Sequence, residues 1–162
     1  AGTTFRVLLP LTSTEPVPPP PAPTSDPDFL AGRRILLVED ESDLRALARK
    51  VLERFGCVVA TACDGLDAET QLRRADAPFD AVILDLVMPR RDGFATFTVL
   101  RDLAPAVPVL VCSGFDASAR AQDLLAEPAT GYLAKPYDRT ELVVALTRLI
   151  SRPVQPDESP TV

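Results

Sequence analysis

The sequence predicts an α/β protein in which helices cover both faces of a parallel five-stranded sheet. Two observations carry this prediction. Five short apolar segments alternate with stretches whose apolar residues recur at helical spacing, an order that is typical of parallel sheets. The apolar segments are continuous rather than alternating, as expected of strands that are buried on both faces.

Each predicted strand is a short, mostly aliphatic run: Ile35–Val38, Val58–Ala60, Ala81–Leu84, Val109–Cys112 and Tyr132–Ala134. The predicted helices follow the strands in turn, over residues 44–55, 66–73, 94–103, 117–126 and from Asp138 onward. Gly56 ends the first helix, as glycine commonly does. In the last helix Glu141 lies three residues after Asp138, which is the spacing of a capping box.

Composition excludes several classes of protein. The 162 residues carry 17 Lys and Arg against 23 Asp and Glu, so the net charge of −6 disfavours a nucleic-acid surface. No apolar run reaches the ~18 residues of a membrane span, so we expect no membrane contact. The absence of histidine excludes a His-based triad, a His-ligated metal and a phosphohistidine. Three cysteines without Cys-x-x-Cys spacing (Cys57, Cys63, Cys112) favour free thiols and a cytoplasmic location.

The uneven use of proline predicts four regions. Residues 1–11 form a short apolar segment, and residues 12–33 form a Pro-rich linker. Within the linker, residues 15–23 predict an extended polyproline-II spacer; a docking motif for a Pro-binding domain is the less common use of such a segment. Residues 34–150 form the main body, and the polar, Pro-containing residues 151–162 predict a disordered tail.

Polar residues follow four of the five predicted strands: Glu39–Asp40–Glu41, then Asp85, Ser113–Gly114 and Lys135–Pro136. In an open α/β sheet, ligands bind outside the carboxyl ends of the strands, where the strand order switches. If the first and third strands are neighbours there, three carboxylates converge, and they repel one another unless a cation joins them. Oxygen ligands without His or Cys suit a hard ion such as Mg²⁺ or Mn²⁺. A metal, a lysine and a hydroxyl around one carboxylate can hold a phosphoryl group on it.

Each of these features also has an ordinary structural explanation. Acidic residues after a strand often cap the next helix, a strand-end aspartate is often a turn residue, and a Lys-Pro pair is often part of a loop. However, Lys135 is one of only two lysines, with Lys50, against 15 arginines. Four such features at the ends of four strands favour a site.

These residues resemble the receiver domains of two-component response regulators, over about Arg34–Ile150. The matching motifs are Val38–Glu41, Asp85–Pro89 with Asp92–Gly93, Cys112–Gly114 and Tyr132–Pro136. The resemblance implies a flavodoxin-like, doubly wound (βα)5 fold with strand order 2-1-3-4-5. Ser113 and Gly114 stand where threonine and alanine are commoner in the family.

The resemblance also implies roles for individual residues. Asp85 would accept the phosphoryl group. Asp40, Asp85 and the backbone carbonyl of Val87 would ligate Mg²⁺, and Glu39 would hold the ion through water. The donor would be a phosphohistidine on a histidine kinase or a histidine phosphotransfer domain.

Three further residues would respond to the phosphoryl group. Lys135 would pair with its oxygens, Ser113 would donate a hydrogen bond to one of them, and Tyr132 would occupy an aromatic switch position; an edge-strand aromatic is the alternative for Tyr132. The added charge of about −1.5 to −2 would change the face formed by the helix over 117–126, the strand over 132–134 and the last helix. We expect output through protein contacts and not through DNA. Receivers attached to kinases are often monomeric, and a dimer through this face is the alternative.

Residues Gly2–Pro10 resemble the last glycine box and final strand of a histidine-kinase ATP-binding domain. Residues 1–11 would then be the remnant of that domain, and the chain would be the C-terminal receiver of a hybrid sensor kinase whose parent can be membrane-anchored. The fragment would lack an ATP site and would catalyse only its own phosphoryl transfer and dephosphorylation. An unrelated amphipathic strand or a cloning remnant is the alternative.

Other functions fit less well. An aspartate-nucleophile phosphatase needs a second aspartate where this chain has Val87, and a dinucleotide-binding oxidoreductase needs a Gly-rich turn where it has Glu39–Ser42. A pseudo-receiver that works without phosphorylation is the realistic rival, but such proteins usually lose the aspartate or the lysine that this chain keeps.

Overall fold

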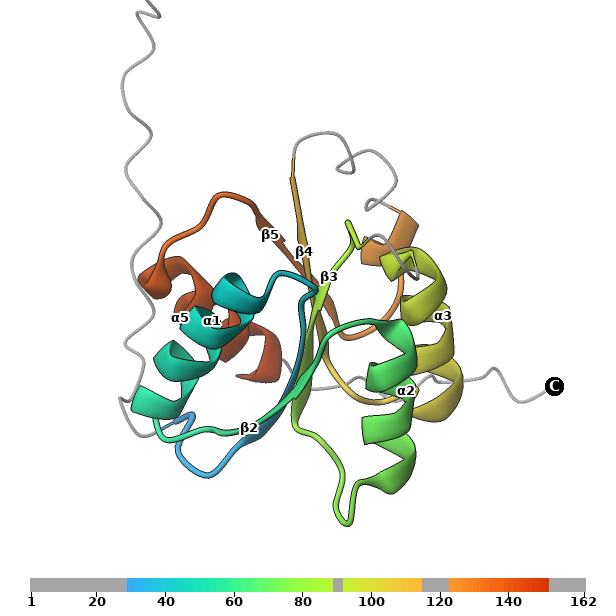
Figure 1. Ribbon diagram of the computed structural model, residues 1–162, viewed down its shortest axis with the longest axis horizontal. Helices are drawn as coiled ribbons and strands as arrows, with labels where there is room; N and C mark the ends of the chain where they lie inside the picture. The colour runs from blue at the N-terminus through green and yellow to red at the C-terminus, as the bar shows by residue number, and fades with distance from the viewer. Residues whose placement is uncertain (1–28, 89–91, 115–122, 152–162) are drawn as a thin grey trace, which may run out of the picture.

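The computed structural model describes residues 29–88, 92–114 and 123–151, and they form one five-stranded sheet with helices on both sides (Figure 1). The sheet order is β2-β1-β3-β4-β5 and every neighbouring pair is parallel, which confirms the predicted fold. The predicted segment 1–11 and most of the Pro-rich linker lie outside the described residues. Of the tail predicted over 151–162, Ser151 is helical, which corrects the prediction there, and residues 152–162 lie outside the described residues.

The five strands are β1 (Arg34–Val38), β2 (Val58–Ala62), β3 (Ala81–Asp85), β4 (Val109–Ser113) and β5 (Thr130–Ala134). Each contains the segment predicted for it. The strands run further than the apolar runs, so that Asp85 and Ser113 are the last residues of β3 and β4.

The helices are α1 (Ser42–Arg54), α2 (Gly65–Arg74), α3 (Gly93–Leu103) and α5 (Arg139–Ser151). Of the helix predicted over 117–126, the described part is helical at residues 123–125, and residues 115–122 lie outside the description. The predicted capping box is confirmed, because Asp138 Oδ1 accepts the N–H of Glu141 at 2.8 Å while Glu141 Oε2 accepts the N–H of Asp138 at 2.8 Å. Gly56 follows α1 with a φ of 81°, which favours glycine.

Two apolar cores lie on opposite faces of the sheet. In β1, Ile35 and Leu37 pack on the face covered by α1 and α5, whereas Leu36 and Val38 pack on the face covered by α2 and α3 (Figure 1). The same alternation continues in β3 and β4, whose residues are all buried. The central strands are therefore apolar at consecutive positions, as predicted.

The expectation that every strand is buried on both faces is wrong for the two edge strands. β2 begins at Val58, whose exposed fraction is 57%, and β5 ends at the exposed Ala134. An edge strand has a neighbouring strand on one side alone, so part of its surface is left to solvent. The central strands are thus the rigid frame from which the site residues project.

Candidate functional site

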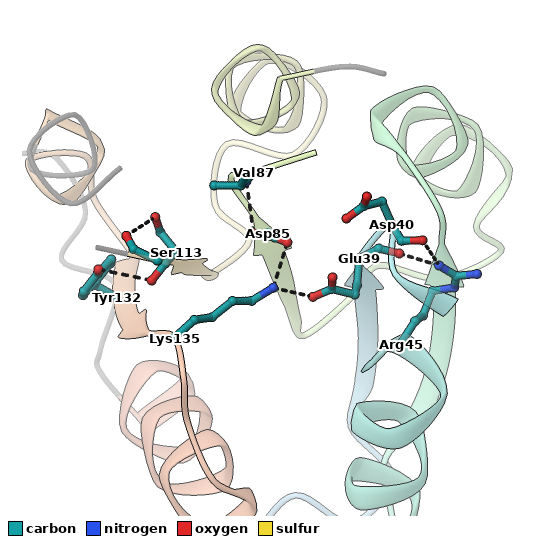
Figure 2. A network of polar contacts seen from close by, with 9 residues as sticks. Glu39, Asp40, Arg45, Asp85, Val87, Ser113, Tyr132 and Lys135 are labelled. Carbon is teal, nitrogen blue, oxygen red and sulfur yellow. Dashed lines mark hydrogen bonds and ion pairs between the residues drawn. The ribbon is translucent and has the colours of Figure 1, made fainter. Parts of the chain in front are cut away.

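The polar residues that follow the strands meet at the carboxyl edge of the sheet (Figure 2). The register explains this convergence, because Val38 lies opposite Leu84 and Asp85 lies opposite Cys112. Glu39, Asp85 and the side chain of Lys135 are thereby brought to one place from β1, β3 and the end of β5. The sequence-based prediction that the first and third strands are neighbours is confirmed.

Three carboxylates form the centre of the site. Oxygen atoms of Glu39, Asp40 and Asp85 all lie within 4.8 Å of one another. Glu39 and Asp85 are 4% and 5% exposed, and Asp40 is half-buried. Ionised carboxylates so close together and so little hydrated are costly unless positive charge joins them. Their oxygens are the ligand type that Mg²⁺ or Mn²⁺ prefers, so these residues fit a hard divalent cation.

Lys135 supplies positive charge between two of these carboxylates. Its Nζ lies 2.7 Å from Glu39 Oε2 and 2.7 Å from Asp85 Oδ2 (Figure 2). Burial by itself would lower the pKa of Lys135, but its hydrogen bonds to Asp85 and Glu39 and their charges outweigh burial and raise that pKa. Burial raises the pKa of Glu39 more than the hydrogen bond and charge of Lys135 lower it. One ammonium therefore leaves this group of three carboxylates with a surplus of negative charge.

The segment after β3 is fixed against Asp85. Asp85 Oδ1 accepts the N–H of Val87 at 3.0 Å, and the side chain of Val87 is exposed. The N–H of Gly93 donates to the carbonyl of Leu86 at 3.2 Å, so α3 begins directly against the end of β3. A Cβ at Gly93 would lie 2.4 Å from Leu86 Cα, which explains why only glycine fits there.

Ser113 and Tyr132 lie on the other side of Asp85 from Glu39 (Figure 2). Ser113 is completely buried, and its hydroxyl donates to the carbonyl of Gly114 at 3.0 Å. The hydroxyl of the half-buried Tyr132 donates to the carbonyl of Ser113 at 3.5 Å. The two predicted switch residues are thus in contact with each other, and the described hydrogen bonds of the serine hydroxyl do not include one to Asp85.

Comparison with known proteins identifies the family. Residues 35–147 match the family model of the response regulator receiver domain. The chain belongs to this family. The receiver domain is 36% identical over 133 residues to the transcriptional regulatory protein PdtaR of Mycobacterium tuberculosis, a match that covers 80% of this chain and 62% of the relative. It is 29% identical over 158 residues to the sensor kinase CckA of Brucella abortus, over 93% of this chain and 17% of that kinase.

Solved structures agree with this assignment. The chemotaxis protein CheY4 of Vibrio cholerae is 30% identical with a TM-score of 0.66, over 74% of this chain and 99% of that one. The receiver domain of a sensor histidine kinase from Pseudomonas aeruginosa is 30% identical with a TM-score of 0.65, over 75% of this chain and 100% of that one. That structure has a magnesium ion coordinated in its active site cleft. The chain thus spans less than two thirds of the length of either of the two curated relatives described above.

Two contacts near the site of this receiver domain were not predicted from the sequence. Arg45 Nη1 donates to the carbonyls of Glu39 and Asp40, at 2.6 and 3.0 Å (Figure 2). Tyr137 packs against the core that contains Cys112, and burial raises the pKa of both groups, that of Cys112 to about 12. A basic residue in the first turn of a helix interacts unfavourably with the helix dipole. The position of Arg45 near the start of α1 was therefore the one feature of the sequence that could have indicated a specific role for its side chain.

An apolar groove of about 1010 Å³ lies beside Lys135, between α1 and the segment that leads into α5. Its lining includes Leu44, Leu47, Val51 and Tyr137. Leu44 and Leu47 are 41% and 60% exposed, so the apolar stripe of α1 is only partly covered by the sheet. All three cysteines of the receiver domain are free, as predicted. Within its described residues, every helix is too short or too polar to cross a membrane.

Proposed function

We propose that this receiver domain accepts a phosphoryl group on Asp85 from a phosphohistidine. The observation that carries the proposal is the position of Asp85, whose carboxylate touches Lys135 at 2.7 Å and lies among the oxygens of Glu39 and Asp40. An isolated structural ion pair needs one carboxylate and one ammonium. A surplus of carboxylates around one lysine is instead suited to a cation and a transferred phosphoryl group.

In this reaction the ionised Asp85 needs no general base. One of its carboxylate oxygens forms the new bond to phosphorus while the bond from phosphorus to the histidine nitrogen breaks, and the imidazole leaves with that electron pair. The ammonium of Lys135 already touches Asp85, so it can neutralise the transferring oxygens. Asp40, Asp85, the carbonyl of Val87 and, through water, Glu39 would hold Mg²⁺ or Mn²⁺. When bound, the ion supplies further neutralisation of the phosphoryl charge.

Ser113 and Tyr132 form the proposed switch. The aspartyl phosphate adds about −1.5 to −2 charge next to a buried hydroxyl, which favours a Ser113 that donates to the phosphoryl group instead of to Gly114. Tyr132 contacts the carbonyl of Ser113 and packs against the core on the α2 and α3 side of the sheet. A movement of Ser113 therefore changes that packing, and with it the face at β5 and α5 that Tyr132 borders. Output is a shift between two populations of this face.

Acetyl phosphate tests the proposed chemistry directly. The chain is incubated with acetyl phosphate and MgCl₂, and its intact mass is measured beside an Asp85→Asn control. We expect a Mg²⁺-dependent gain of one phosphoryl group that the control lacks. No gain with acetyl phosphate or with a phosphorylated histidine phosphotransfer domain, together with no Mg²⁺ binding, would overturn the proposal in favour of a pseudo-receiver.

The groove along α1 is the proposed docking surface for the phosphodonor. A histidine has to approach Asp85 from outside, and the exposed Leu44 and Leu47 lie beside Lys135 in the groove. Leu47→Ala should slow transfer from a phosphorylated histidine phosphotransfer domain by about tenfold and leave labelling by acetyl phosphate unchanged. Leu66→Ala is the matched control, since Leu66 is 61% exposed but lies on α2. Equal rates for both variants would remove the groove from the proposal.

A hybrid sensor kinase is the proposed parent of this receiver domain. The match to the sensor kinase of Brucella abortus covers 93% of the chain, whereas residues 34–162 are 129 of the 162 residues. The matched region therefore includes residues of the predicted ATPase remnant or linker. Sequencing the reading frame upstream of Ala1 tests this origin. A kinase core encoded there would support the proposal, and a start codon directly before Ala1 would contradict it.

A further inference from the structure

We propose that Arg45 is a positioning residue, which fixes the backbone between β1 and α1 so that the carboxylates of Glu39 and Asp40 face Asp85. This inference rests on the proposed function, because it concerns the cation that the carboxylates would hold. One nitrogen of Arg45 bonds the carbonyls of both acidic residues, at 2.6 and 3.0 Å (Figure 2). These contacts hold the backbone and leave the carboxylate oxygens for other partners.

The two carbonyls lie where regular structure provides no partner. β1 ends at Val38, and the N-cap of α1 is Glu41, whose carbonyl accepts the N–H of Arg45 at 2.9 Å. Glu39 and Asp40 are the residues between the strand and the helix. A partly buried carbonyl outside both a ladder and a helix needs another donor. The side chain of Arg45 returns across the first turn of α1 and becomes that donor.

Electrostatics alone would not favour a guanidinium here. Positive charge in the first turn of a helix opposes the helix dipole. It also repels a divalent cation at the neighbouring carboxylates, where Lys135 is already present. The two explanations of Arg45 therefore predict opposite changes in cation affinity when the residue is replaced. If its charge is what matters, removing it tightens cation binding, whereas if its hydrogen bonds position the acidic residues, removing it weakens binding.

Arg49 provides a matched control on the same helix. It lies one turn further along α1, carries the same charge and pairs with Glu53 at 2.7 Å, away from the acidic loop. Arg49→Met therefore makes the same change in net charge without removing a bond to Glu39 or Asp40. Arg45→Lys keeps the positive charge at position 45 and loses the planar guanidinium.

The first measurement is calorimetric titration of MgCl₂ into the complete chain and its variants. We expect Arg45→Met to weaken Mg²⁺ binding by at least about tenfold, the usual scale for a residue that orients metal ligands. Arg45→Lys should recover part of the loss, and Arg49→Met should bind as the unsubstituted chain does or slightly more tightly. Binding by Arg45→Met that is as tight as that of Arg49→Met would overturn the inference.

The second measurement needs no metal. Amide hydrogen exchange over residues 39–41 should accelerate in Arg45→Met and stay unchanged in Arg49→Met, and equal protection in both variants would overturn the inference. If the unsubstituted chain binds no Mg²⁺ and gains no phosphoryl group from either donor, the proposed function fails, while the exchange result still decides the role of Arg45. If Arg45→Met does not fold, Arg45→Lys carries the same comparison.

Discussion

The two ends of the sheet hold their charges differently. At the amino end, Arg33 Nη1 pairs with Asp80 Oδ1 at 2.8 Å, and Asp80 Oδ2 accepts the N–H of Arg34 at 2.8 Å. One acid and one base complete that group. At the carboxyl end, Lys135 is shared between two carboxylates, and a third lies within 4.8 Å. A balanced pair joins two elements, whereas an unbalanced group is suited to bind something that carries charge.

The two groups of charges also differ in how far water reaches them. The side chains of Arg33 and Asp80 are 40% and 30% exposed, so water weakens both their attraction and the cost of separating them. The side chains of Glu39 and Asp85 are each only 6% exposed beside Lys135. The excess charge thus lies in the drier of the two places, where it costs more stability. A local loss of stability of this kind is typical of functional sites.

The largest expected difference comes from removing the cation at each end. Lys135→Met leaves two buried carboxylates without their ammonium, and in metal-free buffer it should lower the free energy of unfolding by about 3 kcal/mol. Arg33→Met should cost less than about 1 kcal/mol, because its pair is exposed. Urea unfolding followed by circular dichroism measures both, and equal losses would mean that the two ends do not differ energetically.

Divalent cations should stabilise one end alone. At a MgCl₂ concentration about 100 times the dissociation constant, the free energy of unfolding should rise by about 2.7 kcal/mol. Asp40→Asn should lose most of this gain, and Asp80→Asn should keep it. Thermal unfolding with and without MgCl₂ checks the prediction, which fails if both variants respond alike.

Replacement of an aspartate by asparagine should change the free energy of unfolding in opposite directions at the two ends of the sheet. Asp85→Asn removes repulsion among carboxylates and keeps an oxygen for the N–H of Val87, so in metal-free buffer it should stabilise the fold by about 1 kcal/mol. Asp80→Asn weakens two hydrogen bonds without relieving any repulsion and should destabilise it by about 1 kcal/mol. Urea midpoints that move in the same direction would contradict the comparison.

The smallest effect is a pH dependence at Glu39. Its folded-state pKa lies above the ordinary 4.5, so the folded protein holds that proton more tightly than the unfolded chain does. The stability from Glu39 is therefore complete below pH 4.5 and is lost as the pH rises through the folded-state pKa. The stability of Glu39→Gln relative to the unsubstituted chain should rise over this window, and parallel pH profiles would show that burial does not act on Glu39 in this way.

The sequence alone predicts the frame and the centre of the site. β1, β3 and β4 were predictable because their apolar runs end abruptly at charged or hydroxyl residues. Each such end fixes where the next side chain projects, and for this reason Asp85 and Lys135 could be singled out. Parallel strands then bring these ends to a single edge whatever the details of the helices.

Other features could not be predicted for physical reasons. The apolar run that begins at Val58 does not show how much of an edge strand the helices cover, so the exposure of Val58 was not expected. The long side chain of Arg45 can point in many directions, and its direction is decided by carbonyls that become available only when β1 and α1 are in place. The exposure of Leu47 is also invisible in a helical pattern, because the pattern does not say how wide a stripe the sheet covers.

The position of Lys135 also has a consequence for chemical labelling. The chain has two lysines, and the other, Lys50, lies on an exposed position of α1. Amine reagents attack the unprotonated amine, and the two carboxylates that raise the pKa of Lys135 keep its Nζ protonated and occupied. Acylation at neutral pH should therefore modify Lys50 and spare Lys135. The ratio of the two modified peptides then reports whether the charged centre is intact, with Lys50 as its internal standard.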